Sequence, residues 1–226
     1  MKLLLFDIDG TLIDPAGAGR RAAENAFMEL FSIPDAFSGI HMAGKTDIRI
    51  MKQGLAAHGL PSDPATLSRI LDLYLDRLRL EILTPDKRLK PGVEQLLPAL
   101  KRLQRIHLSL LTGNIEQGAR IKLEPFGLNR FFSSGAFGSD HEDRDLLLPI
   151  ALRKIRELTG VRIPPADCVV IGDTPADVRC AKVHGAFALA VATGPYTADR
   201  LLAAGADLVL EDLSGALDAL KPHLEE

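Results

Sequence analysis

The hydrophobic positions of the chain alternate between short continuous runs and stretches with helical spacing. The continuous runs are typical of strands buried on both faces, and they occur at 3–8, 107–112, 131–136, 168–172, 186–192 and 207–210. Amphipathic segments that predict helices follow at 92–104, 116–125, 145–159, 175–184, 197–203 and 212–220. Strands that alternate with helices of this length predict a parallel sheet with right-handed crossovers. We therefore expect an α/β fold with a doubly wound, Rossmann-like sheet.

One part of the chain breaks this alternation. After the first strand the sequence shows only helical patterns, at 18–31, 47–58 and 64–83. The segments on either side, 14–19 and 84–91, are rich in Gly and Pro and are expected to be hinges. We predict a catalytic core made of residues 1–14 plus 89–226 and an inserted, all-helical cap domain over residues 15–88.

Composition and charge narrow the class of protein. The chain has 226 residues, of which 46% are hydrophobic and 25% charged, and its formal net charge is -3. Such a balance predicts a globular protein without the basic surface that nucleic acid requires. No apolar run approaches the roughly 20 residues that span a bilayer. The two cysteines, Cys168 and Cys180, suggest no disulfide framework, so we expect a cytoplasmic protein. From the charge balance and the short apolar runs we expect neither a nucleic-acid nor a membrane partner.

Polar side chains gather where the predicted strands end. The residues at these ends are Asp7, Asp9, Thr112, Gly113, Asn114, Asp173 and Asp177. Ligands of a doubly wound sheet bind beyond the carboxyl ends of its strands, so these residues are expected to share one crevice. Gly10 lets the chain leave the first strand and bring Asp9 back toward that crevice.

The chemistry of these side chains points to a metal and a phosphate. Carboxylates that lie close together repel one another unless a cation separates them. Hard oxygen ligands without a neighbouring His or Cys suit Mg²⁺. The Thr-Gly-Asn turn supplies a hydroxyl, an open backbone and an amide, which are donors for phosphoryl oxygens. The same segment is also compatible with an ordinary strand-to-helix turn in which Asn114 is the helix N-cap.

Three segments resemble known motifs. DIDGT at 7–11, LLTGN at 110–114 and IGDTPAD at 171–177 are similar to three of the four motifs of the haloacid dehalogenase-like hydrolases. The helical insert resembles the cap that these enzymes carry after the first motif. Among the subgroups, the chain looks most similar to members of the phosphoglycolate phosphatase type.

The resemblance implies a role for each matching residue. Asp7 would be the nucleophile that forms an aspartyl phosphate, and Asp9 the acid and then the base. The Asp7 and Asp173 carboxylates and the Asp9 carbonyl would hold Mg²⁺, with Asp177 supporting the metal through water. Thr112, Gly113 and Asn114 would bind the transferred phosphoryl group.

The third motif departs from the family's pattern. Members usually carry a Lys before the helix that leads to the fourth motif, but the segment 138–145 contains no lysine. Arg144 is the natural replacement, because it is a permanent cation directly ahead of the helix predicted at 145–159. We therefore expect Arg144 to act as the catalytic cation.

The cap is expected to set the substrate. The segment Gly44-Lys45-Thr46-Asp47 resembles the specificity loop of related enzymes. Lys45 is therefore a candidate to contact the end of the substrate that lies away from the phosphate, for example a carboxylate. Alternatively, Lys45 is solvated and Asp47 caps the next helix. A small phosphorylated metabolite is the expected substrate, and the sequence separates neither the ester nor the oligomeric state.

Other activities of the same scaffold stay open at this point. A phosphomutase needs the same residues, including a second acid such as Asp9. A dehalogenase needs the nucleophile without Asp9, so the presence of Asp9 counts against it. A phosphonate-cleaving enzyme would need a cap lysine, for which Lys45 and Lys52 are available. A non-catalytic phosphate-binding module would not be expected to keep Asp7, Asp9 and Asp173 together.

Overall fold

A six-stranded parallel sheet forms the centre of the computed structural model, which describes residues 1–224. In the order β5-β4-β1-β6-β7-β8, its strands are Gly135–Phe137, Ile106–Thr112, Lys2–Phe6, Cys168–Gly172, Phe187–Val191 and Leu208–Leu210. Every pairing in this sheet is parallel. The chain moves from β1 to one side and later returns to the other side, so the switch point lies at β1 and β6. The α/β class predicted from the apolar runs is confirmed.

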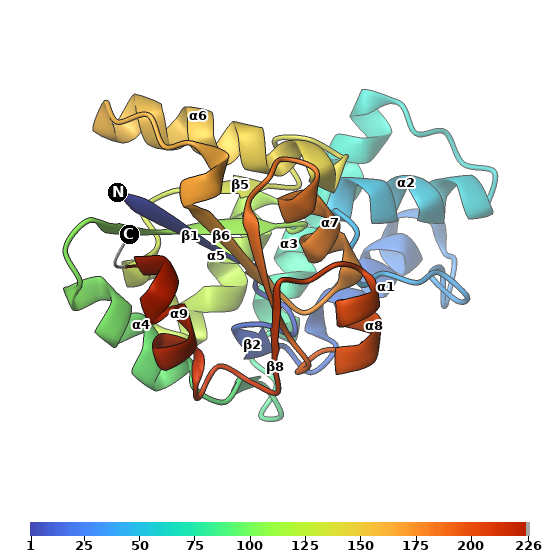
Figure 1. Cartoon of the computed structure of the whole chain (residues 1–226). Helices are drawn as coiled ribbons and strands as arrows, with labels where there is room; N and C mark the ends of the chain where they lie inside the picture. Colours follow the sequence, from blue (N-terminus) through green and yellow to red (C-terminus); the bar gives the residue numbers. More distant parts are fainter. Residues whose placement is uncertain (225–226) are drawn as a thin grey trace.

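Helices cover both faces of this sheet, as Figure 1 shows. Because side chains alternate along a strand, Leu4 and Phe6 of β1 face one layer, while Leu3 and Leu5 face the other. The helices on the first face are α4 (Val93–Arg102), α5 (Glu116–Leu123) and α9 (Ala216–Leu224). Those on the second face are α6 (Leu147–Thr159), α7 (Pro175–Lys182) and α8 (Ala198–Ala203).

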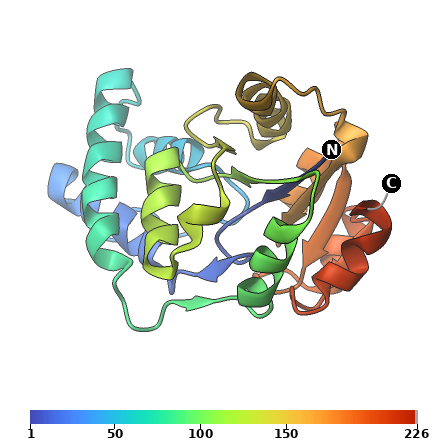
Figure 2. The same ribbon diagram turned by 90° about the vertical axis from the view of Figure 1, so that its left-hand side faces the viewer.

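A separate helical layer stands beside the carboxyl ends of the strands. It consists of α1 (Ala18–Phe31), α2 (Asp47–Ala57) and α3 (Pro64–Glu81). These helices have an apolar core of their own, in which the rings of Phe27 and Phe37 pack edge to face. In Figure 2 they lie at the end of the molecule opposite α9, and α3 runs beside α5. The three helices predicted between residues 15 and 88 are therefore present.

A short hairpin joins the insert to the core. The strands β2 (Ile13–Asp14) and β3 (Arg88–Leu89) pair antiparallel, and Arg88 donates to Asp14 Oδ2 at 2.7 Å. From the sequence we expected only irregular hinges at 14–19 and 84–91, because strands of two residues are too short to show a hydrophobic pattern. The hairpin holds side by side the two segments through which the chain enters and leaves the helical insert. The domain division at residues 14 and 89 stays a prediction.

Other boundaries shift for local reasons. The strand expected at 131–136 begins only at Gly135, because Leu128–Phe131 winds into a 3-10 turn. The helix expected from residue 145 starts at Leu147, after a 3-10 turn over Arg144–Leu146. Such single turns do not carry a periodic signal.

None of the helices in residues 1–224 combines the length and the apolar character that crossing a bilayer requires.

Candidate active site

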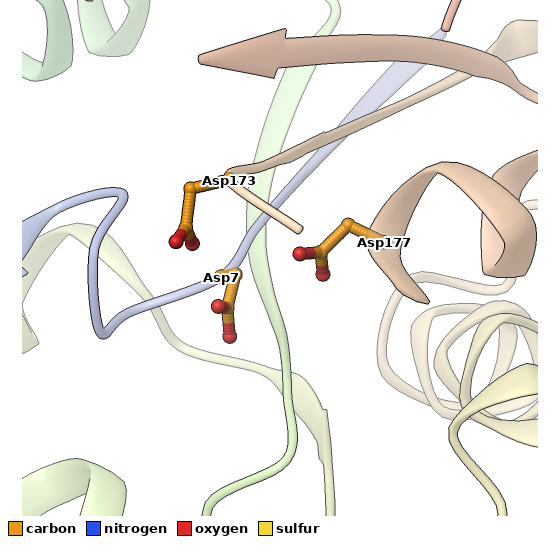
Figure 3. Close-up of side chains that lie close together, drawn as sticks. All are labelled: Asp7, Asp173 and Asp177. Atoms are coloured by element: carbon orange, nitrogen blue, oxygen red, sulfur yellow. The ribbon is translucent and has the colours of Figure 1, made fainter. Parts of the chain in front are cut away.

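Three aspartates meet beyond the carboxyl ends of β1 and β6, at the switch point of the sheet. Asp7 directly follows β1, Asp173 directly follows β6, and Asp177 lies in the first turn of α7. One carboxylate oxygen of each lies within 4.8 Å of the others. Figure 3 shows the side chains converging from the two strands and the helix. The structure therefore brings Asp7 together with two aspartates at least 166 positions further along the chain, in a group that could hold a metal ion.

The surroundings of Asp173 leave little space. Thr11 Oγ1 donates to Asp173 Oδ1 at 3.0 Å. Gly10, at a φ of +87°, and Gly194 both approach the carboxylate so closely that a Cβ on either would lie 2.3 and 1.7 Å from Oδ2. Burial, and the neighbouring charge of Asp7, raise the pKa of Asp173 well above its ordinary value. A bound cation would offset both effects.

Arg144 lies against the proposed nucleophile. Its Nη2 contacts Asp7 Oδ1 at 3.0 Å and also Asp177 Oδ1, and all three side chains are buried. Burial raises the pKa of Asp7 to about 6, although the guanidinium of Arg144 acts in the opposite direction. Burial alone would disfavour the Arg144 charge, but Asp177 and Asp7 raise the pKa of the guanidinium above its ordinary value. A permanent cation thus stands where the third motif predicted one.

Asp177 has a second task at the start of α7. Its Oδ2 accepts from the Thr174 N–H at 3.1 Å and from Thr174 Oγ1 at 2.7 Å, while Thr174 caps the helix. With Arg144 on Oδ1, both of its oxygens already have protein partners. Asp7 and Asp173 are therefore the more available direct ligands, and Asp177 would support them from behind.

The Thr-Gly-Asn turn lies beside Asp7 and Asp9. Asn114 Nδ2 donates to Asp9 Oδ2 at 2.7 Å and to Thr112 Oγ1 at 2.8 Å. Gly113 has no space for a side chain, because a Cβ would lie 2.2 Å from the Lys45 carbonyl oxygen. The expectation that Asn114 caps the next helix is wrong, because Ile115 is the N-cap residue of α5 and the amide is used at Asp9 instead.

A second buried cation was missed by the sequence analysis. Lys122 of α5 is only 4% exposed, and its Nζ lies 2.9 Å from Asp9 Oδ1 and 2.8 Å from Asp9 Oδ2. It also donates to Asn114 Oδ1 at 2.6 Å. Burial alone would lower the pKa of Lys122, but the carboxylates of Asp9 and Asp47 raise it above the ordinary value.

The cap closes over the turn through the start of α2. Thr46 is the N-cap of α2, so the alternative in which Asp47 caps this helix is wrong, and Thr46 Oγ1 donates to the Glu142 carbonyl at 2.8 Å. The Asp47 N–H donates to the Gly113 carbonyl at 2.8 Å, and Asp47 Oδ2 accepts from the Ile115 N–H at 2.9 Å. Asp47 thus satisfies the free N–H at the start of α5, which fixes α2 against the Thr-Gly-Asn turn.

A cavity of about 280 Å³ lies between core and cap. Its core end is lined by Asp7, Asp9, Thr112, Asn114, Lys122, Arg144 and Asp173. Its cap end is lined by Arg20, Met42, Lys45, Ile50, Met51 and Tyr74. Lys45 Nζ donates to Gln53 Oε1 at 2.7 Å, and burial together with Arg49 lowers the pKa of Lys45. Lys52 lies elsewhere, in an exposed ion pair with Glu142.

The charges of the core end do not cancel among themselves. The ionisable side chains in direct contact there are Asp7, Asp9, Asp173, Asp177, Lys122 and Arg144. Taken as ionised, these four carboxylates and two cations leave a formal charge of about -2, and all of them except Asp9 are buried. A divalent cation with oxygen ligands would neutralise it, so the residues fit such an ion.

Comparison with known proteins places this geometry in a family. A family model described as haloacid dehalogenase-like hydrolase matches residues 1–185. A protein from Chromobacterium violaceum named phosphoglycolate phosphatase is 28% identical over 233 residues, which cover 98% of this chain and 97% of that protein. One of the same name from Caulobacter vibrioides is 29% identical over 217 residues, 92% of this chain and 85% of its own length.

Solved structures share the whole fold. The crystal structure of CbbY from Rhodobacter sphaeroides in complex with phosphate has a TM-score of 0.77 and 22% identity, and the match covers 100% of both chains. A hydrolase from Pseudomonas syringae has a TM-score of 0.74 and 25% identity over 98% of this chain and 99% of its own. Since the family model spans most of the sequence, this chain belongs to the haloacid dehalogenase-like hydrolases.

Proposed function

We propose that the protein is a Mg²⁺-dependent phosphatase that hydrolyses small phosphate monoesters through an aspartyl phosphate on Asp7. The arrangement around Asp7 is the observation that carries this proposal. Its carboxylate lies at the end of the central strand, 3.0 Å from a buried guanidinium and within 4.8 Å of two further carboxylates. A nucleophile, a fixed cation and a metal site at the floor of one cavity are the parts that phosphoryl transfer requires.

In the first step, Asp7 would attack phosphorus. The new bond joins an Asp7 carboxylate oxygen to phosphorus, and the bond from phosphorus to the ester oxygen breaks. Arg144 keeps the carboxylate oriented through Oδ1 and balances the charge that develops on the phosphoryl oxygens. Asp9 lines the same cavity and would give its proton to the departing alkoxide.

In the second step, water would release the phosphate. Asp9, deprotonated in the first step, takes a proton from a water molecule that attacks phosphorus. The bond to Asp7 breaks, and inorganic phosphate and the free carboxylate are regenerated. Thr112 and Asn114 line the space where the phosphoryl group would sit, so the hydroxyl and amide are placed to hold it through both steps.

Mg²⁺ would be held by Asp7 and Asp173, with the backbone carbonyl of Asp9 as a further ligand and Asp177 behind them. Bound there, the ion would supply positive charge to the phosphate and to the crowded carboxylates. The fit rests on the hard oxygen donors and on the raised pKa of Asp173, which reflects burial and the charges of Asp7 and Asp177, only partly offset by Thr11 and Arg144.

The size of the cavity limits the substrate. About 280 Å³ admits a phosphate with a small leaving group, and the relatives named phosphoglycolate phosphatase fit this class by name. One structural neighbour, a CbbY variant, was solved with xylulose-(1,5)bisphosphate. We propose a small phosphorylated metabolite as substrate, with Lys45 at the cap end as a candidate contact for its distal group.

Metal removal is the first test. Phosphate release is measured from a panel of esters that includes 2-phosphoglycolate, sugar phosphates, nucleoside monophosphates and p-nitrophenyl phosphate. We expect release with Mg²⁺, loss of release after chelation, and recovery when Mg²⁺ is added back. Undiminished release in metal-free protein would contradict the metal assignment. Interconversion of phosphosugars without net phosphate release would favour the mutase instead.

The glycine beside the metal site gives a sharper prediction. In Gly194→Ala the new Cβ would lie 1.7 Å from Asp173 Oδ2, so the carboxylate must move. We expect the Mg²⁺ concentration for half-maximal activity to rise by about 10–100-fold, because the ligand is displaced while its charge remains. Gly215→Ala is the matched control, since no atom lies within 4 Å of its added Cβ. Equal Mg²⁺ dependence in both variants would place the metal away from Asp173.

A further inference from the structure

Lys122 has every ammonium donor directed at the residues proposed to move protons and bind phosphate. An ammonium group has three N–H donors, and the three contacts of Lys122 go to Asp9 Oδ1, Asp9 Oδ2 and Asn114 Oδ1. The lengths lie between 2.6 and 2.9 Å, which is typical of charge-assisted hydrogen bonds. With its donors occupied, the lysine has none left for a substrate.

The lysine also decides which way the Asn114 amide points. A lysine only donates, so the amide must turn its oxygen toward Lys122. Its nitrogen then faces Asp9 Oδ2 at 2.7 Å and Thr112 Oγ1 at 2.8 Å. A single cation therefore fixes both the carboxylate of Asp9 and the donor face of the phosphate-binding turn.

Residues of both the core and the helical insert surround the side chain of Lys122. It lies on α5 of the core, while Gly19 of cap helix α1 comes so close that a Cβ there would be 3.2 Å from Lys122 Nζ. The carboxylate of Asp47 in cap helix α2 adds negative charge on the cap side. The ammonium thus lies between the helical insert and the core.

The two buried cations of the site serve different carboxylates. Arg144 contacts Asp7 and Asp177, whereas Lys122 contacts Asp9. We propose that Lys122 is a positioning residue that holds the Asp9 carboxylate, and with it the Asn114 amide, in the geometry needed for proton transfer. This inference rests on the proposed phosphatase function, because Asp9 has a proton to move only if an ester is cleaved.

The test compares esters whose leaving groups differ in their need for a proton. An alkyl phosphate such as 2-phosphoglycolate needs protonation of its departing oxygen, whereas p-nitrophenolate leaves readily as an anion. In Lys122→Met we expect kcat/KM for the alkyl ester to fall by about 100-fold, as for a misplaced catalytic group. The loss with p-nitrophenyl phosphate should be much smaller, with KM little changed for either ester.

A second measurement shows whether the lysine acts through Asp9. In an Asp9→Asn background, Lys122→Met should cause little further loss of kcat with the alkyl ester, because the group that it positions is gone. Lys2→Met is the matched control, since Lys2 forms a partly buried ion pair with Asp167 at the amino end of the sheet. This control should keep the activity of the native protein with both esters.

The outcomes that overturn the proposal are distinct. Equal losses with both esters, a rise in KM in place of a fall in kcat, or full additivity with Asp9→Asn would each assign Lys122 another role. If Lys122→Met does not fold, Lys122→Gln keeps a neutral N–H donor with a reach one atom shorter, and the same comparisons apply. Should the native protein cleave no ester, the proposed function fails. A double-mutant cycle on the free energy of unfolding still tests the Lys122–Asp9 pair, and zero coupling would refute it.

Discussion

Asp7→Asn is expected to lower the rate of phosphate release on the order of 10⁴-fold or more, which is the largest effect predicted for this chain. The amide has the shape of the carboxylate but no anionic oxygen to attack phosphorus. It also removes one of the two carboxylates that are most available to a metal. Neither Arg144 nor Asp173 is expected to take over the attack, because the first is a cation and Thr11 Oγ1 holds Oδ1 of the second.

The same variant should remain folded. Burial raises the pKa of Asp7 to about 6, so at neutral pH the folded state carries an ionised group that burial disfavours. Because the pKa of Asp7 is higher in the folded state than in the unfolded state, the free energy of unfolding falls as the pH rises toward and through the folded-state pKa. A neutral amide does not ionise, so the variant does not lose this stability. We expect the Tm of metal-free Asp7→Asn to equal or exceed that of the native protein.

Two measurements check the assignment of Asp7. Phosphate release is followed at saturating Mg²⁺ in Asp7→Asn and in Asp167→Asn, whose carboxylate pairs with Lys2 at the opposite end of the sheet. The control should remain active. Rapid quenching with a ³²P-labelled ester should trap label on the native protein and not on Asp7→Asn. Turnover by Asp7→Asn at the native rate would remove Asp7 from the mechanism.

The residues that the sequence could predict are those whose signal is local. The apolar run before Asp7 and the run before Asp173 each identify a buried strand, and parallel strands place their carboxyl ends together. Nothing more than this rule is needed to expect the two aspartates in one crevice. Arg144 could be predicted because the family resemblance implies a cation ahead of the helix that leads to the fourth motif, and Arg144 is the cation at that place.

The residues that were missed depend on packing between distant elements. Lys122 belongs to an amphipathic helix in which a lysine is usually solvated, and only its neighbours show otherwise. Ala119 and Leu123 are buried on the same face, so a lysine at this spacing lies on the apolar side of α5. That signal was present in the sequence. The contact of Asp47 with the first N–H of α5 left no such signal, because it joins the cap to the core.

Arg144→Met is expected to produce the second large effect, a loss of activity on the order of 10²–10³-fold. The guanidinium is 4% exposed and contacts both Asp7 and Asp177, so its removal leaves two buried carboxylates without their cation. Removing one partner of such a buried group typically costs about 3–5 kcal/mol of stability. The variant should therefore lose both turnover and Tm, and Mg²⁺ should restore part of the Tm by supplying positive charge.

Arg144→Lys separates the charge of this residue from its shape. Both carboxylates are contacted by one nitrogen, Nη2, and the buried Nε has no hydrogen-bond partner among residues 1–224. A single ammonium could make the same two contacts, so the paired N–H groups that distinguish a guanidinium from an ammonium are not needed for them. We expect Arg144→Lys to retain far more activity than Arg144→Met, at a cost set by the shorter reach of the lysine side chain.

The comparison is made on kcat, with 2-phosphoglycolate and p-nitrophenyl phosphate as substrates. Arg144 acts on the phosphoryl group, so Arg144→Met should slow both esters alike, in contrast to Lys122→Met. Arg179→Met is the control, because Arg179 forms an exposed pair with Asp145 and should leave kcat unchanged. If Arg144→Lys were as inactive as Arg144→Met, more than one N–H group of the guanidinium would be required for activity. A phosphate oxygen would then have to bind the free Nε. If both variants were fully active, Arg144 would be a structural partner of Asp177 alone.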